Sequence, residues 1–282
     1  MYCYWFVVKT QSIFIINNNI TIMINFSTIE NNLTELNKKF YSASPFPYVV
    51  IDNFADEQKL HKILATFPVP GADNINKSRD YMFAKNKYEK ANFKEVSSEC
   101  NEIYQDLTGD RFQNIIRQIT KQNVFVDREF HGGGIHQGGE GSFLDMHIDF
   151  NYHPCHHNWF RNLNILLYLN PGWQPEYGGQ LKLKHVETGS YSEIKPLFNR
   201  CVIMFTRDYT LHGYDPISFP SGQFRRSIAT YAYNIDVNPQ KQRSTLWIPQ
   251  TASPLKRAIG QYWPSLVRAK STVLGSRTAK NK

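Results

Sequence analysis

The chain has 282 residues, of which 41% are hydrophobic and 14% aromatic, so it can bury a full core. This composition indicates one globular domain with extensions and no second independent catalytic domain. The formal net charge of +8 is unevenly placed: nine of the 32 basic residues follow position 240, with no acidic residue among them. That leaves 23 basic and 24 acidic residues before it, so the body is near neutral.

Residues 1–22 begin with an apolar patch but lack a basic leader, and they are too interrupted to span a bilayer. A signal peptide and membrane insertion are therefore not expected. Because the globular pattern begins at Met23, this stretch is interpreted as a non-native or disordered extension. The four cysteines show no pairing pattern, which is typical of a reducing compartment and predicts a cytoplasmic protein: Cys3, Cys100, Cys155 and Cys201.

Residues 23–122 are expected to form a supporting region of one strand and three helices. Residues 45–52 have the composition of a strand, and the polar residues 71–93 predict a surface loop. The helix expected from Asp110 begins with Asp-x-x-Gln, an arrangement typical of a capping box. Apolar stripes at helical spacing predict the helices at residues 55–67, at 95–107 and from Asp110 onward.

From residue 123 the pattern changes to short apolar runs separated by Gly, Pro and Asn. Helices followed by such runs predict a mainly β fold with flanking helices, whose core over residues 123–237 is a double-stranded β-helix, or jelly roll. The glycines at 138–141 predict a turn or bulge, because no Gly-Lys-Ser/Thr and no helix follow as in a phosphate loop. Strands are expected at 124–130, 134–137, 162–170, 180–184, 201–205 and 226–233.

The clearest candidate site is His147-Ile-Asp149, because alternation along a strand puts both side chains on one face. His212 is the best third ligand downstream. Two histidines and one carboxylate form a facial triad that binds iron(II) and leaves positions open for a bidentate cosubstrate and oxygen. Arg225 and Ser227 share a later strand face, where a guanidinium and a hydroxyl can bind a distal carboxylate.

In this order, the residues resemble the iron(II)/2-oxoglutarate-dependent oxygenases, and within them the prolyl 4-hydroxylase-like branch. The resemblance covers roughly residues 123–235 and rests on His147-Ile-Asp149, the runs 161–170 and 194–205, Trp173, Tyr177-Gly-Gly179, His212 and Arg225-Arg-Ser227. It implies that His147, Asp149 and His212 bind Fe(II). It also implies that Arg225, rather than Arg226, binds the C5 carboxylate of 2-oxoglutarate, because the family pattern is Arg-x-Ser. The other residues expected to bind the cosubstrate are Ser227, Tyr168 and, on the same strand face as Tyr168, Asn164.

The implied activity is that of a dioxygenase that uses Fe(II), 2-oxoglutarate and O2, with ascorbate as reductant. It would hydroxylate an unactivated C–H bond, in a prolyl or other residue of a protein or peptide, while 2-oxoglutarate is decarboxylated to succinate. A hydroxylase of a small molecule or glycan would share every site residue. The alternative of another class is a non-catalytic jelly-roll module whose basic tail binds a polyanion.

Two other branches of the superfamily do not fit. A halogenase would lack the carboxylate ligand, whereas Asp149 is present. The pattern of the alkylation-repair demethylases is an arginine followed six positions later by a second arginine. In this chain the sixth position is Tyr231 when counted from Arg225 and Ala232 when counted from Arg226.

The cluster His153-Pro-Cys155-His156-His157 lacks the ligand spacing of structural zinc sites and is interpreted as a polar loop. His131 and His136 are expected to be polar strand or loop groups. His136 and Gln137 nevertheless fall where the first barrel strand faces the cosubstrate.

The basic tail is residues 238–282. Its charge is typical of a solvated or mobile end; the alternative is an anionic partner, for which nucleic acid is not favoured. Its apolar residues up to Val267 predict that the first part covers the outside of the barrel or an oligomer contact and contributes no ligand, while the residues from Lys270 on are mobile. The oligomeric state is left open.

Overall fold

The computed structural model describes residues 22–70, 76–77, 80, 82–249, 254–256, 258–260 and 262, so the extension before Ile22 and the residues after Tyr262 lie outside it. The helices are α1 Phe26–Glu30, α2 Leu33–Ser42, α3 Glu57–Thr66, α4 Ser98–Thr108 and α5 Asp110–Thr120, with short 3-10 turns at Phe93–Glu95 and Pro175–Tyr177. The strands are β1 Tyr48–Asp52, β2 Asn76–Lys77, β3 Ala84–Lys90, β4 Phe125–Val126, β5 Gly134–Ile148, β6 Trp159–Tyr168, β7 Leu181–His185, β8 Tyr191–Ile194, β9 Arg200–Phe205, β10 Thr210–Tyr214, β11 Arg225–Ile235 and β12 Leu246–Trp247.

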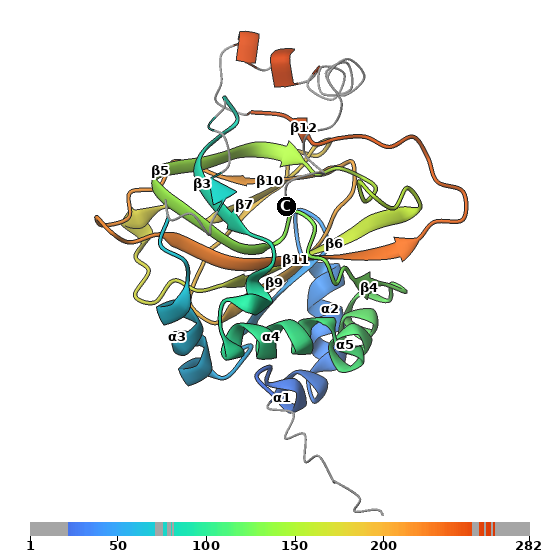
Figure 1. Ribbon diagram of the computed structural model, residues 1–282. Coiled ribbons are helices and arrows are strands. Elements are labelled where there is room, and N and C mark those ends of the chain that lie inside the picture. The colour runs from blue at the N-terminus through green and yellow to red at the C-terminus, as the bar shows by residue number, and fades with distance from the viewer. Residues whose placement is uncertain are drawn as a thin grey trace, which may run out of the picture.

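The strands form a curled antiparallel sheet in the order β1-β9-β6-β11-β5-β10-β7-β8 (Figure 1). β5 joins two halves of this sheet, β1-β9-β6-β11 on one side and β10-β7-β8 on the other. Its residue Ile135 pairs with Ile228 of β11, and its residue His147 pairs with His212 of β10. The predicted jelly roll with flanking helices is confirmed. Among the described residues, no helix is both apolar enough and long enough to cross a bilayer.

Helices α1–α5 cover one face of the half β1-β9-β6-β11 and lie on the same side of the sheet in Figure 1. Strand alternation divides the residues: Ile165 and Ile203 pack in the core shared with the helices, whereas Val202, Met204 and Tyr168 pack inside the barrel. Because both faces are covered, residues 165–168 of β6 and 201–205 of β9 are continuously apolar, as buried strands require, while the first part of β6 carries polar residues.

The predicted capping box at Asp110 is wrong. Gly109 occupies the N-cap position, and no side chain caps α5. Gly109 lies between the end of α4 and the start of α5, and a Cβ there would come within 3.0 Å of the Gln105 carbonyl. Asp110 is therefore already the first helical residue, and the Gln113 amide donates to the Thr108 carbonyl instead.

The surface loop predicted at residues 71–93 is also wrong in part, because this stretch contains β2 and β3. β3 pairs along β5, from Ala84 opposite Leu144 to Lys90 opposite Ile135. Its polar sequence, Ala-Lys-Asn-Lys-Tyr-Glu-Lys, lacks the apolar alternation from which strands are predicted. The glycines at 138–141, predicted as a turn or bulge, lie within β5, and the register with β3 shifts between Phe143 and Gly138, which agrees with a bulge rather than a turn.

Candidate active site

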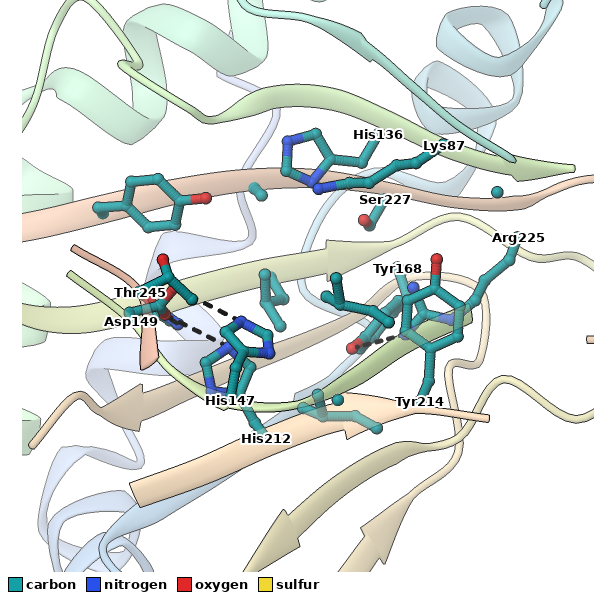
Figure 2. A pocket seen from close by; sticks show the side chains of 18 of the residues that line it. Lys87, His136, His147, Asp149, Tyr168, His212, Tyr214, Arg225, Ser227 and Thr245 are labelled. Atoms are coloured by element: carbon teal, nitrogen blue, oxygen red, sulfur yellow. Dashed lines mark hydrogen bonds and ion pairs between the residues drawn. The ribbon is translucent and has the colours of Figure 1, made fainter. Parts of the chain in front are cut away.

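A cavity of about 220 Å³ opens inside the barrel between the two halves of the sheet. Figure 2 shows His147, Asp149 and His212 at one end and Arg225, Tyr168 and Tyr214 at the other. The two ends therefore offer different chemistry, one suited to a metal and one to an anion.

The metal end is formed where β5 and β10 pair. His147 lies directly opposite His212, so their ring centroids are 4.2 Å apart, and Asp149 follows the last residue of β5. Nε2 of His147 is 3.6 Å from Oδ1 of Asp149, and Nε2 of His212 is 3.3 Å from Oδ2. One ligand atom from each of the three residues lies within 4.8 Å of the others, so the set can hold one metal ion.

Two neighbours on β6 orient the Asp149 carboxylate. Arg161 and Asn164 donate to its Oδ2 at 2.9 and 2.8 Å. Burial alone would raise the pKa of Asp149, but the guanidinium and the two imidazoles outweigh burial and hold the pKa well below its usual value. The carboxylate is therefore ionised, with Oδ1 directed toward His147.

The environments of the two imidazoles suit metal binding. Burial lowers the pKa of His212 to about 3, and the neighbouring His147 adds to this effect, so His212 is neutral near pH 7. Nδ1 of His147 is 2.9 Å from the Asp145 carbonyl, which fixes the ring with Nε2 toward the cavity. Two imidazole nitrogens and one carboxylate fit a divalent iron ion.

The anion end is formed by β6, β11 and the segment before β7. Arg225 is buried; its Nε donates to the Gly179 carbonyl at 2.7 Å, and its Nη2 to the Tyr168 hydroxyl at 3.3 Å. Gly179 has φ +80°, and a Cβ there would come within 2.9 Å of the arginine side chain. Ser227 lies opposite Tyr168 in the strand register, so their side chains share one face.

Residues 133–233, which contain all three metal-site residues and Arg225, match the family model of the 2OG-Fe(II) oxygenase superfamily. This barrel is a 2OG-Fe(II) oxygenase domain. The predicted superfamily and enzyme class are thus confirmed, with Fe(II), 2-oxoglutarate and O2 as cofactor and cosubstrates; the use of ascorbate stays a prediction. No curated protein sequence matches the chain.

Solved structures share the fold of this oxygenase at low identity. A prolyl hydroxylase from Trichoplax adhaerens in complex with a hypoxia inducible factor peptide fragment has 17% identity and a TM-score of 0.52, covering 74% of this chain and 90% of that one. A prolyl 4-hydroxylase from Phytophthora capsici has 16% identity and a TM-score of 0.52, covering 88% and 77%. The epimerase SnoN from nogalamycin biosynthesis has 11% identity and a TM-score of 0.51, covering 79% and 97%.

The structure separates the two adjacent arginines of the oxygenase. Arg225 lines the cavity, whereas Arg226 is not among the lining residues; its Nε donates at 3.0 Å to the side chain of Gln137, which does line the cavity. Asn164 lines the cavity too, but its contacts are with Asp149 and Arg161 rather than with the Arg225 end.

Sequence reasoning assigned no site role to several residues of the cavity wall, among them Lys87, Arg161, Thr245 and Trp247. Lys87 lies on the strand that was predicted as a loop. Trp247 belongs to the tail, which was predicted to cover the outside of the barrel; its β12 instead pairs with His147 and Ile148 at the cavity. The one feature of the sequence that could have indicated a role for Trp247 in the site is its large aromatic side chain within an otherwise basic tail.

The histidine-rich loop after Asp149 has a structural role. His153 is buried, with Nε2 3.6 Å from Oδ2 of Asp127, and its Nδ1 accepts the Cys155 backbone N–H. In the part of the chain that the structure describes, only the triad brings three possible metal ligands together. His136, by contrast, lines the oxygenase cavity and lies opposite Ser227.

Proposed function

We propose that this oxygenase hydroxylates an unactivated C–H bond of a prolyl or other residue in a protein or peptide. The observation that carries the proposal is the single cavity with a three-ligand metal site at one end and a buried arginine at the other. When bound, Fe(II) with 2-oxoglutarate and O2 supplies the oxidising chemistry and releases succinate and carbon dioxide.

The proposed roles follow from the contacts. Nε2 of His147, Nε2 of His212 and Oδ1 of Asp149 hold the iron, while Arg161 and Asn164 occupy the other carboxylate oxygen and keep Asp149 in place. A set of two histidines and one carboxylate would leave coordination positions free for the cosubstrate and O2.

Arg225, Tyr168 and Ser227 are proposed to bind the C5 carboxylate of 2-oxoglutarate. The Arg225 guanidinium already lies against Gly179 and Tyr168, so its orientation is set before the cosubstrate binds. The face of Tyr214 lies 4.1 Å from the guanidinium, and Ser142 contacts the Tyr214 hydroxyl at 2.9 Å. Asn164 is proposed to approach the cosubstrate from the metal end.

A peptide acceptor is supported by the prolyl hydroxylases among the similar structures, one of which contains a peptide fragment. The epimerase with the same fold makes a small-molecule acceptor the alternative to test. A glycan acceptor belongs to the same alternative.

The test is acceptor profiling with ¹⁸O₂, Fe(II) and 2-oxoglutarate over peptide and small-molecule libraries. The proposal expects a peptide that gains one oxygen atom carrying the label, together with labelled succinate. A small molecule as the one labelled product would reassign the substrate class. Succinate formation with no labelled acceptor in any library would contradict hydroxylation.

A further inference from the structure

Two segments outside the family match close the cavity on one side. β3, before the match, pairs with the first part of β5, and β12, after the match, pairs with its end. The rings of Phe83 and Trp247 stack at 5.2 Å with an interplanar angle of 5°, so the two segments contact each other. They contribute Lys87, Thr245 and Trp247 to the lining.

Lys87 directs an ammonium group into this cavity from β3. It lies opposite Gly138, which in turn lies opposite Arg225, and both Lys87 and Arg225 line the cavity. In Figure 2 the Lys87 side chain extends beside His136, along the wall opposite the metal ligands. A lysine that faces the inside of a barrel is uncommon unless it is paired.

The contacts of Lys87 leave hydrogen-bonding capacity. Its described ion-pair partner is Glu89, at 2.8 Å, whereas an ammonium carries three N–H donors. Burial alone would lower the pKa of Lys87, but the charge of Glu89 and the nearby tyrosines outweigh burial, and the pKa is raised. Lys87 therefore remains charged over the range in which enzymes work.

The other two cations of the described lining already have roles in the proposed function. Arg161 is bound to Asp149 and stacks on Tyr231 at 3.5 Å, and Arg225 contacts Gly179 and Tyr168. Three cations in this lining face one carboxylate, Asp149, with Glu89 beside it. Because Fe(II) and the dianion of 2-oxoglutarate balance each other, one positive charge remains in the loaded cavity.

We propose that Lys87 is a specificity-determining residue that binds a carboxylate of the acceptor substrate, while Trp247 packs against the adjoining carbon skeleton. The inference rests on the proposed function and narrows its substrate class. Trp247 is suited to this contact because its ring lies 4.8 Å from the His147 ring, beside the metal site. An acceptor held between the ammonium and the indole lies next to the oxidising centre.

The experiment compares acids with their neutral amides in the holoenzyme loaded with Fe(II) and 2-oxoglutarate. The probes are N-acetyl amino acids, N-acetyl-L-proline among them, each paired with its primary amide. Succinate formation above the background without acceptor is measured, and binding to the Mn(II)-loaded enzyme is measured by calorimetry. At least one acid is expected to exceed its amide by about 10- to 100-fold, the value of a charge-assisted hydrogen bond.

The Lys87→Met variant is expected to remove this preference, and Lys87→Arg to keep most of it. Lys85→Met is the matched control, since Lys85 is an exposed lysine of the same strand, and it should keep the preference. A panel without acid preference, or an unchanged preference in Lys87→Met, overturns the proposal. The proposal is also overturned if the 2-oxoglutarate dissociation constant of Lys87→Met rises by as large a factor as the acid preference falls. That result would assign the ammonium to the cosubstrate. If wild-type enzyme shows no metal-dependent binding of 2-oxoglutarate, the proposed function itself has failed.

Discussion

Nη2 of Arg161 lies 2.9 Å from Oδ2 of Asp149 in the interior of the barrel. The guanidinium also donates to Oδ1 of Asn164, and Nδ2 of Asn164 donates to the same carboxylate oxygen of Asp149. The three side chains therefore form a closed set of hydrogen bonds. Both charges are buried, and removing one member leaves the other without compensation. The position of a metal ligand thus depends on a residue that does not touch the metal.

Replacement of Arg161 by methionine should weaken metal binding. Loss of the groups that orient a ligand typically costs about 10- to 100-fold in metal affinity, so the Mn(II) dissociation constant should rise by that factor. Calorimetric titration with Mn(II) measures it. Arg111→Met is the control, because it breaks the surface ion pair with Glu30 far from the cavity. Equal dissociation constants for the two variants would show that Asp149 does not need Arg161.

The two adjacent arginines should differ in their effect on cosubstrate binding. Arg225→Ala should weaken 2-oxoglutarate binding by roughly 2 to 5 kcal/mol, because a buried charge-assisted pair is lost. Arg226→Ala should act mainly through packing, since Arg226 does not itself line the cavity and its guanidinium contacts the Gln137 side chain. Titration of both variants with 2-oxoglutarate measures this, and the reverse order of effects would refute the assignment.

Much of this site could be predicted because local patterns specify it. His147 and Asp149 are close in sequence, and alternation along β11 separates Arg225 from Arg226. Lys87 and Trp247 could not be predicted, because each reaches the cavity through pairing with a distant part of β5. The polar composition of β3 and the brevity of β12 give no periodic signal. β10 also has no periodic signal. His212 could be proposed as a ligand, but the pairing that places it opposite His147 could not be predicted.

The tail should be needed for the site as well as for stability. Trp247 stacks on Phe83, and the Ile248 N–H donates to the Met146 carbonyl at 2.8 Å. Truncation after Val237 removes these contacts and should give unstable or insoluble protein, whereas truncation after Arg268 should leave turnover almost unchanged. Thermal unfolding and succinate formation are the measurements. A stable and active chain ending at Val237 would favour the anionic-partner role for the tail.

Asp127 should contribute to acid stability. Burial would raise its pKa, but the nearby His153 ring and hydrogen bonds from the backbone N–H groups of His131 and Glu129 outweigh it and lower the pKa. A folded pKa below the unfolded value of about 3.9 stabilises the protein above that pH, and the contribution is lost as pH falls through the folded pKa. The free energy of unfolding below about pH 4 should therefore fall more steeply in wild type than in Asp127→Asn. Parallel pH curves would show that the contacts of Asp127 add no net stability.

The most direct test of the central claim is succinate formation from 2-oxoglutarate with Fe(II), O2 and ascorbate. Wild type should release succinate slowly without an acceptor, and His147→Ala, Asp149→Ala and His212→Ala should each abolish the release while keeping wild-type circular dichroism. His61→Ala, a replacement of an exposed histidine on α3, should behave as wild type. Near-normal succinate release by any of the three triad variants would contradict the assignment of iron to His147, Asp149 and His212.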